Sequence, residues 1–333
     1  MAENNALLQV NQLKKYFPAD SHLLFGRGKE FVHAVDDINF SIQGGEVFGL
    51  VGESGCGKST TGRLVLRLIE PTSGEVIFDL ENLFSLDRES LRRKRRSMQI
   101  IFQDPYSSLN PRLRIRTTLA EPFIVHHICK KTEIEERLRV LLETVGLEPD
   151  VLDRFPHEFS GGQRQRIAIA RAIALKPKFI VADEPVSSLD VSVQAQILNL
   201  LADLRDQFQL TFLFISHSLP VVAHLCDRIA VMYLGKIVEE GTTEEVFTRS
   251  AHPYTRALLS AVPEPDPKPK SSRLVLRGEI PSAVKVPSGC RFHPRCPIAD
   301  AACAAGEPPR ETISATHWSA CFKFKDAAQL AIK

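Results

Sequence analysis

The stretch "GESGCGKST", residues 52–60, matches the pattern G-x-x-x-x-G-K-S/T at every fixed position. It follows the apolar run "EVFGLVG" (46–52), which predicts a buried strand of the kind found in parallel sheets. A helix is expected from Lys58 onward. A strand, a glycine-rich turn and a helix in this order predict an α/β fold with a phosphate-binding loop.

Each residue type in this loop suits the binding of phosphate. Glycines let backbone N–H groups point inward at an anion, and the helix N-terminus adds about half a positive charge. Lys58 is expected to reach the β- and γ-phosphates of ATP, and Ser59 to ligate Mg²⁺. The expected ATP contacts of the loop are Gly52, Glu53, Ser54, Gly55, Cys56, Gly57, Lys58, Ser59 and Thr60.

The segment "FIVADEP" (179–185) predicts an apolar strand that ends in two carboxylates. Asp183, at the carboxyl end of the strand, is expected to hold Mg²⁺ through water. Glu184 follows directly and is expected to act as a general base toward the attacking water. The phosphate loop elsewhere in the chain favours this catalytic interpretation over a helix-capping role.

The segment "FSGGQRQR" (159–166) begins a strongly helical run, in which Ser160 is expected to be the N-cap. A second helix N-terminus that can receive phosphate is therefore predicted, although the chain has only one phosphate-reaching lysine. We infer a head-to-tail pair of chains, each of which offers this helix end to the nucleotide of its partner. The residues expected to make that contact are Ser160, Gly161, Gly162 and Gln163.

The order of the predicted elements defines the domain organisation. Residues 1–50 are expected to be rich in strand and 104–175 to form a helical insert, whereas strands alternate with helices over 178–234. Such alternation predicts a mostly parallel sheet covered on both faces. We therefore predict an ATPase domain over 1–262, followed over 263–333 by a proline-rich linker and a small cysteine-rich module.

The composition limits the class of protein. The net charge of +2 gives no reason to expect nucleic-acid or membrane-lipid binding. The one dense basic run, "RRKRR" (92–96), is interpreted as a solvated helix face. No signal peptide is recognised, and no stretch reaches the roughly 20 apolar residues of a membrane span. We expect a cytosolic chain, in which structural disulfides are rare.

Taken together, several strings resemble those of the ATP-binding subunits of ABC transporters. They are "GESGCGKST", Gln103 in "IIFQDPYSSLNP", "FSGGQ", "FIVADEP", "SSLD" (187–190) and "SH" (216–217), and the resemblance covers roughly residues 7–250. It implies a P-loop NTPase core with a mostly parallel sheet, an antiparallel β subdomain and a helical subdomain. Two departures, Phe159 for a leucine and Ser218 for an aspartate, remove no group from the chemistry but leave the rate of hydrolysis open.

The resemblance also implies roles for matched residues. Tyr16 would stack on adenine, with Phe17 as the next candidate. Gln103 would contact Mg²⁺ and the attacking water, and Asp190 would communicate across the dimer. His217 would clamp the γ-phosphate, for which a reachable imidazole donor is well suited.

The C-terminal segments resemble a narrower group. "HPYTRALLSAVPEP" (252–265) and "LRGEIPSAVKVPSGCRFHPRCP" (276–297) are similar to the C-terminal extension of dipeptide and oligopeptide importers, in particular to that of the second of their paired ATPases. This implies an ATPase that powers peptide import at the cytoplasmic face of the cytoplasmic membrane, with nickel or another small solute as the alternative. The implied partners are a paralogous ATPase or a second copy of this chain, two membrane permease subunits and, indirectly, an extracytoplasmic solute-binding protein.

Two other hypotheses stay open. A soluble ABC-type ATPase acting on ribosomes or DNA usually has two fused ATPase halves or a long coiled-coil insert. This chain has one copy of each motif and no sustained heptads. A subunit that senses metal or redox state through its cysteines is compatible with a transport role.

Four cysteines form a separate candidate site in the C-terminal module: Cys290, Cys296, Cys303 and Cys321. Their spacing of x5, x6 and x17 is not that of a usual zinc site, yet a short module with little apolar core calls for a staple. Four thiolates suit an iron–sulfur cluster or zinc, and free thiols or disulfides are alternatives. The resemblance favours a 4Fe-4S cluster with a structural role, because peptide-importer ATPases of this type carry one at similar cysteines; His293 and His317 are nearby substitute ligands.

Overall fold

The computed structural model describes residues 6–19, 30–262, 274, 276, 278–327 and 330. These residues form two compact units. The phosphate-loop unit comprises Met1–Ile42, Val47–Phe84 and Ser216–Lys333, and the helical unit comprises Gln43–Glu46 and Ser85–Ile215. The proline-rich start of the predicted linker, residues 263–273, lies outside the described residues.

The phosphate-loop unit contains an antiparallel sheet with the strand order β2-β1-β4-β5. The strands are β1 (Leu8–Pro18), β2 (Phe31–Ile42), β4 (Ser73–Phe78) and β5 (Glu81–Asn82). Alternate residues of β1, such as Leu8 and Val10, are fully buried, as expected for strands with one face on the core. The sheet is the antiparallel β subdomain that the sequence predicts.

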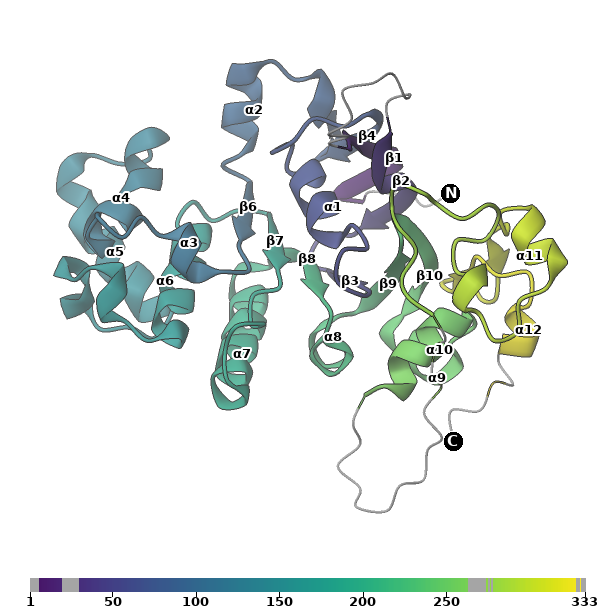
Figure 1. Ribbon diagram of the computed structural model, residues 1–333. Coiled ribbons are helices and arrows are strands. Elements are labelled where there is room, and N and C mark those ends of the chain that lie inside the picture. Colours follow the sequence, from purple (N-terminus) through teal and green to yellow (C-terminus); the bar gives the residue numbers. More distant parts are fainter. Residues whose placement is uncertain are drawn as a thin grey trace, which may run out of the picture. The chain divides into compact units, whose positions relative to one another are not determined.

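A second group of strands in this unit has the order β11-β12-β10-β9-β3. Figure 1 labels β10, β9 and β3 of this group. They are β3 (Val47–Val51), β9 (Arg228–Tyr233), β10 (Lys236–Thr242), β11 (Glu311–Thr312) and β12 (Trp318–Ser319). Strands β3 and β9 are parallel, and the other pairs are antiparallel. Every residue of β3 is buried, which confirms the buried strand predicted before the glycine-rich turn.

Helices of the phosphate-loop unit follow these strands. They are α1 (Lys58–Val65), α8 (Leu219–Leu225), α9 (Thr243–Arg249) and α10 (Pro253–Ser260), with α11 (Ala301–Ala305) and α12 (Phe324–Ala327) in the C-terminal region. The first of them begins at Lys58, as predicted.

The C-terminal region joins the sheet of the phosphate-loop unit. Strand β12 pairs with β10 through Glu239↔Ser319 and Glu240↔Trp318, and β11 extends the sheet by one more strand. From the sequence, this region is predicted only to be a small module. Two-residue strands are too short to show an alternating pattern, which is why they escape sequence-based prediction.

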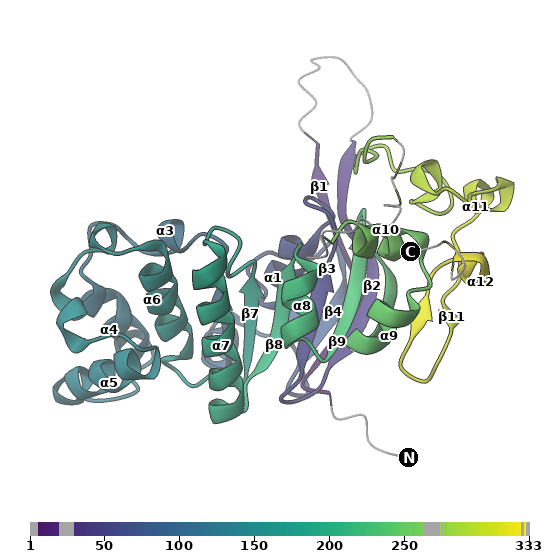
Figure 2. The ribbon, with the colours of Figure 1, turned by 90° about the horizontal axis from the view of Figure 1, so that it is seen from below.

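The helical unit contains the parallel strands β8-β7-β6. Their bounds are β6 (Met98–Ile101), β7 (Phe179–Asp183) and β8 (Thr211–Ser216). The helices are α2 (Arg88–Lys94), α3 (Pro105–Ser108), α4 (Ile115–Val125), α5 (Lys131–Thr144), α6 (Gly161–Ile173) and α7 (Val191–Phe208). Helices α3–α6 gather into one cluster (Figure 2), within the stretch that the sequence predicts to be helical.

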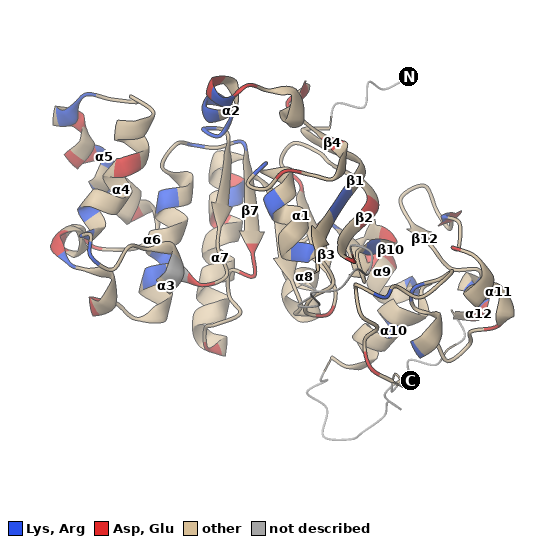
Figure 3. Cartoon of the chain, turned by 45° about the horizontal axis from the view of Figure 1, so that its top comes forward, with Lys and Arg blue, Asp and Glu red and all other residues tan. Residues whose placement is uncertain are grey.

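The basic run at 92–96 begins in helix α2, on which Lys and Arg gather in Figure 3. No residue of α2 is buried, so this run has the solvated character that the sequence analysis expects. Among the described residues, no helix combines the length and apolar character needed to cross a membrane.

Glu239 of β10 is a buried carboxylate that holds the C-terminal region in place. Its oxygens accept hydrogen bonds from the backbone N–H groups of Ala251 (2.6 Å) and His252 (3.0 Å), where α10 begins. The Nε2 atom of His317, just before β12, lies 2.8 Å from Oε1, and the side chains of Glu239 and His317 are 0% and 1% exposed. One carboxylate thus joins β10, the start of α10 and the segment that leads into β12.

We predict that Glu239→Ala lowers the free energy of unfolding by about 3 kcal/mol, because buried donors lose their acceptor. Urea unfolding followed by circular dichroism measures this loss. Glu244→Ala is the matched control, since Glu244 lies exposed on α9. Equal stability of the two variants would contradict the assignment.

Candidate functional site

The phosphate loop turns tightly against β2 in the phosphate-loop unit. Gly57, directly before α1, has φ 111°, a left-handed conformation that favours glycine. A Cβ atom at this position would lie 2.1 Å from the carbonyl oxygen of Ala34, so a side chain is sterically excluded. The loop therefore needs glycine here for close backbone packing as well as for presenting N–H groups.

Lys58 points back into its own loop and is only 4% exposed. Its Nζ atom donates to the carbonyl oxygens of Gly52 (2.8 Å) and Glu53 (3.0 Å) and lies 3.9 Å from the sulfur of Cys56. Of the three donors of this ammonium group, two bind carbonyl groups and the third faces the sulfur of Cys56, which is a weak acceptor. The loop is thus built around a positive charge that can also bind a phosphate.

Tyr16 belongs to the same unit and packs against β2. Its ring centroid lies 4.2 Å from that of His33, and its hydroxyl donates to Asp36. Burial and the hydrogen bond to Asp36 raise the pKa of Tyr16, so the phenol stays protonated at neutral pH. His217, the expected γ-phosphate clamp, is an exposed residue directly after β8.

Asp183 and Glu184 are placed by strand β7 of the helical unit. Asp183 is the last residue of the strand and is buried. Glu184 follows with φ 48°, and its backbone N–H donates to Ile215 of β8 (2.9 Å). A left-handed backbone conformation is uncommon for glutamate. Here it ends the extended backbone of β7, so the carboxylates of Asp183 and Glu184 point in different directions.

Gln103 lies next to Glu184 although many residues separate them in the sequence. The Nε2 atom of Gln103 donates to Oε2 of Glu184 over 2.9 Å. The structure thus brings together the residues expected to sense and to activate the attacking water.

The N-termini of α6 and α7 lie close together in the helical unit. Ser160 caps α6 by accepting from Gln163 N–H (3.3 Å), and the Gln163 side chain accepts from Ser160 N–H (3.1 Å). A Cβ atom on Gly162 would meet Val193 of α7 at 2.6 Å, so the second glycine allows the two helices to pack closely. The N-cap of α6 predicted from the sequence is confirmed.

Asp190 caps helix α7 by accepting a hydrogen bond from Val193 N–H (3.0 Å). This bond from the backbone lowers the pKa of Asp190, which therefore carries its negative charge at neutral pH. The expected dimer-contact residues, Ser160–Gln163 and Asp190, thus lie at two neighbouring helix N-termini.

Cys290, Cys296, Cys303 and Cys321 line one small pocket, together with Phe292, His293 and other residues. None of the seven cysteines forms a disulfide, so the disulfide alternative is not seen. Burial raises the pKa of Cys296 to about 11 and that of Cys321 to about 12. Thiolate ligation therefore requires a cation that displaces these protons.

The cysteine pocket has the sulfur donor atoms that a metal group needs, but these atoms are not arranged to ligate one metal ion. Within the described ranges, no three His, Cys, Asp or Glu residues stand where they could hold one metal ion. His293 lines the pocket, whereas the ring of His317 is engaged with Glu239. Of the two substitute ligands, only His293 lies beside the thiols.

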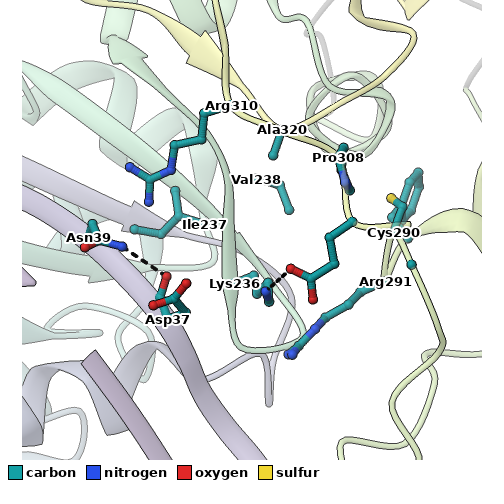
Figure 4. Close-up of a pocket in the computed structure, with 13 residues that line it drawn as sticks. Asp37, Asn39, Lys236, Ile237, Val238, Cys290, Arg291, Pro308, Arg310 and Ala320 are labelled. Carbon is teal, nitrogen blue, oxygen red and sulfur yellow. Dashed lines mark hydrogen bonds and ion pairs between the residues drawn. The ribbon is translucent and has the colours of Figure 1, made fainter. Parts of the chain in front are cut away.

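Two arginines between the first two of these cysteines are absent from the site predicted from the sequence. Arg291 pairs with Asp36, and Arg295 pairs with Glu53 of the phosphate loop. Figure 4 shows Arg291 beside a pocket of about 210 Å³ between β2, β10 and the C-terminal region. Their position between two cysteines in "GCRFHPRCP" could have drawn attention to these arginines. Only the structure shows that their partners are Asp36 and Glu53.

Comparison with known proteins gives the family. Residues 35–187 match the family model "ABC transporter", and residues 238–303 match "Oligopeptide/dipeptide transporter, C-terminal region". A protein of Brucella ovis is 52% identical over 317 residues, which is 95% of this chain and 98% of the relative. The chain belongs to the ATP-binding proteins of ABC transporters.

Further relatives and solved structures agree with this assignment. The oligopeptide transport ATP-binding protein AppF of Bacillus subtilis is 48% identical over 96% of this chain and 98% of the relative. The dipeptide transport ATP-binding protein DppF of Haemophilus influenzae is 47% identical over 96% of this chain and 97% of the relative. The bacterial ABC transporter cassette MJ0796, solved as a dimer, is also similar in structure. The match covers 71% of this ABC ATPase and 98% of the MJ0796 chain, with a TM-score of 0.62 and 30% sequence identity.

For this ABC ATPase we predict that Lys58→Ala abolishes ATP binding or hydrolysis, because the loop loses its only buried ammonium. Equilibrium dialysis with labelled ATP measures the binding. Lys325→Ala, which changes an exposed lysine of the same unit, is the control. Unchanged ATP binding together with unchanged ATP hydrolysis in Lys58→Ala would rule out the expected role of the loop.

Proposed function

We propose that this chain is the ATP-hydrolysing subunit that powers the import of dipeptides and oligopeptides across the cytoplasmic membrane. The observation that carries the proposal is the union of two features in one chain: a complete phosphate loop and the C-terminal region of oligopeptide/dipeptide transporters. Relatives named for oligopeptide and dipeptide transport match over nearly the whole chain. The chain would work at the cytoplasmic face of the membrane, bound to its membrane partners.

Hydrolysis is assigned to the carboxylate of Glu184. It would take a proton from the attacking water as general base, while Gln103, in contact with it, orients the carboxylate and the water. Mg²⁺, which neutralises phosphate charge when bound, would be held by Ser59, Gln103 and Asp183. These residues offer hydroxyl, amide and carboxylate oxygens, the donor types that Mg²⁺ prefers.

Nucleotide binding is assigned to the loop Gly52–Thr60, with Tyr16 against adenine and His217 at the γ-phosphate. Lys58 supports this assignment, since its ammonium is already oriented by the carbonyl groups of the loop. Protonation of the Tyr16 phenol at neutral pH leaves its ring uncharged for stacking.

The proposed partner in hydrolysis is a paralogous ATPase or a second copy of this chain, arranged head to tail. Each chain would present Ser160–Gln163 and Asp190 to the nucleotide held by the other. The neighbouring helix N-termini of α6 and α7 support this role, because a helix N-terminus favours an anion. Two membrane permeases would form the pathway, and an extracytoplasmic solute-binding protein would deliver the peptide.

We expect Glu184→Gln to lower ATP turnover by roughly 100-fold or more, because the amide cannot accept the proton of the attacking water. In proteoliposomes that contain the permeases and the partner ATPase, ATP-dependent uptake of a labelled peptide should stop while ATP stays bound. Glu136→Gln, at an exposed position of α5, is the control. Rapid ATP hydrolysis by Glu184→Gln would contradict the assignment of Glu184 as the general base. ATP hydrolysis by the wild-type complex without peptide uptake would contradict the proposal that peptides are the transported solute.

We further propose that Cys290, Cys296, Cys303 and Cys321 hold a 4Fe-4S cluster, which would staple the C-terminal region together. Support comes from the four sulfur donors around one pocket and from the absence of disulfides among the described cysteines. Zinc is the alternative for the same donors.

Anaerobically purified protein is expected to be brown and to contain about four irons per chain. Metal analysis and the visible absorption spectrum provide the measurement. Cys296→Ala should lose the iron, whereas Cys129→Ala, a cysteine of the helical unit, should retain it. A colourless protein with one zinc per chain would end the cluster proposal.

A further inference from the structure

The segment from Cys290 to Cys296, here called the arginine arm, lies against the phosphate loop. The guanidinium of Arg295 donates two hydrogen bonds to the carboxylate of Glu53, at 2.7 Å and 3.1 Å. The side chains of Arg295 and Glu53 are 8% and 26% exposed, so solvent screens this pair only in part. Two parallel bonds of this kind fix the direction of the carboxylate as well as neutralising it.

Glu53 is held through its backbone as well as its side chain. Its N–H donates to the hydroxyl of Tyr254 in α10 (2.8 Å), and its carbonyl oxygen accepts from Nζ of Lys58 (3.0 Å). One residue of the loop is therefore attached to the arginine arm, to α10 and to the phosphate-binding lysine. The main chain of Glu53 therefore connects the residue bound by Arg295 to Lys58.

The arm itself is anchored in the core of the phosphate-loop unit. Phe292, between the two arginines, is 1% exposed and packs edge-on against Tyr233, with the ring centroids 5.2 Å apart. The ring of Tyr254 lies 5.5 Å from that of Phe292. Aromatic packing of this kind makes the arm a rigid support for Arg295.

The other arginine of the arm reaches a second nucleotide-binding element. Arg291 pairs with Asp36 and donates to the carbonyl oxygen of Leu234, and Asp36 accepts the hydroxyl of Tyr16. Burial alone would raise the pKa of Asp36, but the Tyr16 hydrogen bond and the Arg291 charge lower it instead. The arm therefore contacts both the phosphate loop and the support of Tyr16.

The Glu53 carboxylate presents an electrostatic problem for a loop that binds a polyanion. Glu53 belongs to the same loop as Lys58, so an unpaired carboxylate on it would compete for the ammonium and repel the phosphates of ATP. A paired and immobilised carboxylate does neither. A guanidinium group stays protonated throughout the physiological pH range, so the neutralising charge is permanent.

We propose that Arg295 is a positioning residue for ATP binding: it neutralises and orients Glu53, and it thereby couples the cysteine-containing C-terminal region to the phosphate loop of the same chain. The inference rests on the proposed function only in that the loop binds ATP. It assigns Arg295 no contact with the nucleotide. It also holds whichever metal, if any, the cysteines bind.

The test compares Arg295→Ala with the double variant Glu53→Gln/Arg295→Ala. Removing Arg295 alone leaves a bare carboxylate, so the dissociation constant and KM for ATP should rise roughly tenfold with a smaller change in kcat. Removing the carboxylate as well should restore most of the ATP affinity, although the arm then has no ionic contact with the loop. Binding of a fluorescent ATP analogue to the purified full chain gives a readout independent of turnover.

The controls separate positioning from simple support of the fold. Arg310→Ala changes an exposed arginine of the same region, stacked on Trp318, and should leave ATP affinity unchanged. Arg295→Lys keeps the charge but loses the paired hydrogen bonds, so it should raise KM only a few-fold. It also keeps the test usable if Arg295→Ala does not fold by circular dichroism.

Two results would overturn the proposal. One is a double variant that binds ATP as weakly as Arg295→Ala, because Arg295 would then act only as a scaffold. The other is an ATP affinity within twofold of wild type in both Arg295→Ala and Arg295→Lys. Failure of the wild-type chain itself to bind ATP would instead reject the proposed function.

Discussion

A lysine ammonium turned back onto the carbonyl groups of its own loop is the interaction on which the phosphate-loop unit depends. Lys58 can take this position only because Gly57 allows the backbone to approach β2 to a distance that excludes a side chain. The same tight turn carries Glu53, whose carbonyl oxygen is one of the acceptors of the ammonium. The close approach of Gly57 to β2 and the buried charge of Lys58 thus determine the conformation of the loop together.

In the helical unit, polar residues are positioned by helix N-termini, whereas in the phosphate-loop unit they are positioned by a glycine-rich turn. Helices α6 and α7 begin side by side, each with a polar N-cap, because Gly162 lets them pack closely. At the end of β7, a left-handed residue places Glu184 within reach of Gln103. Capping groups and the left-handed backbone of Glu184 therefore arrange these polar residues.

The C-terminal region is an integral part of the phosphate-loop unit. Its short strands extend the sheet beyond β10, and Glu239 connects it to the beginning of α10. Its arginine arm pairs two guanidinium groups with carboxylates, one of them in the phosphate loop and the other in β2. A region that looks accessory in the sequence thus supplies the neutralising charge for a carboxylate in the phosphate loop, so changes around its cysteines have a direct route to that loop.

The sequence by itself determined the family, the strand–loop–helix order and the N-cap of α6, because these depend on local patterns such as "GESGCGKST" and "FSGGQ". It also identified Gln103 and Glu184 as individual residues. Only the tertiary structure placed them in contact, paired Arg295 with Glu53 and joined β12 to β10. The physical reason is that ion pairs and sheet edges between distant segments depend on how the chain packs, and no local spacing records which carboxylate an arginine will meet.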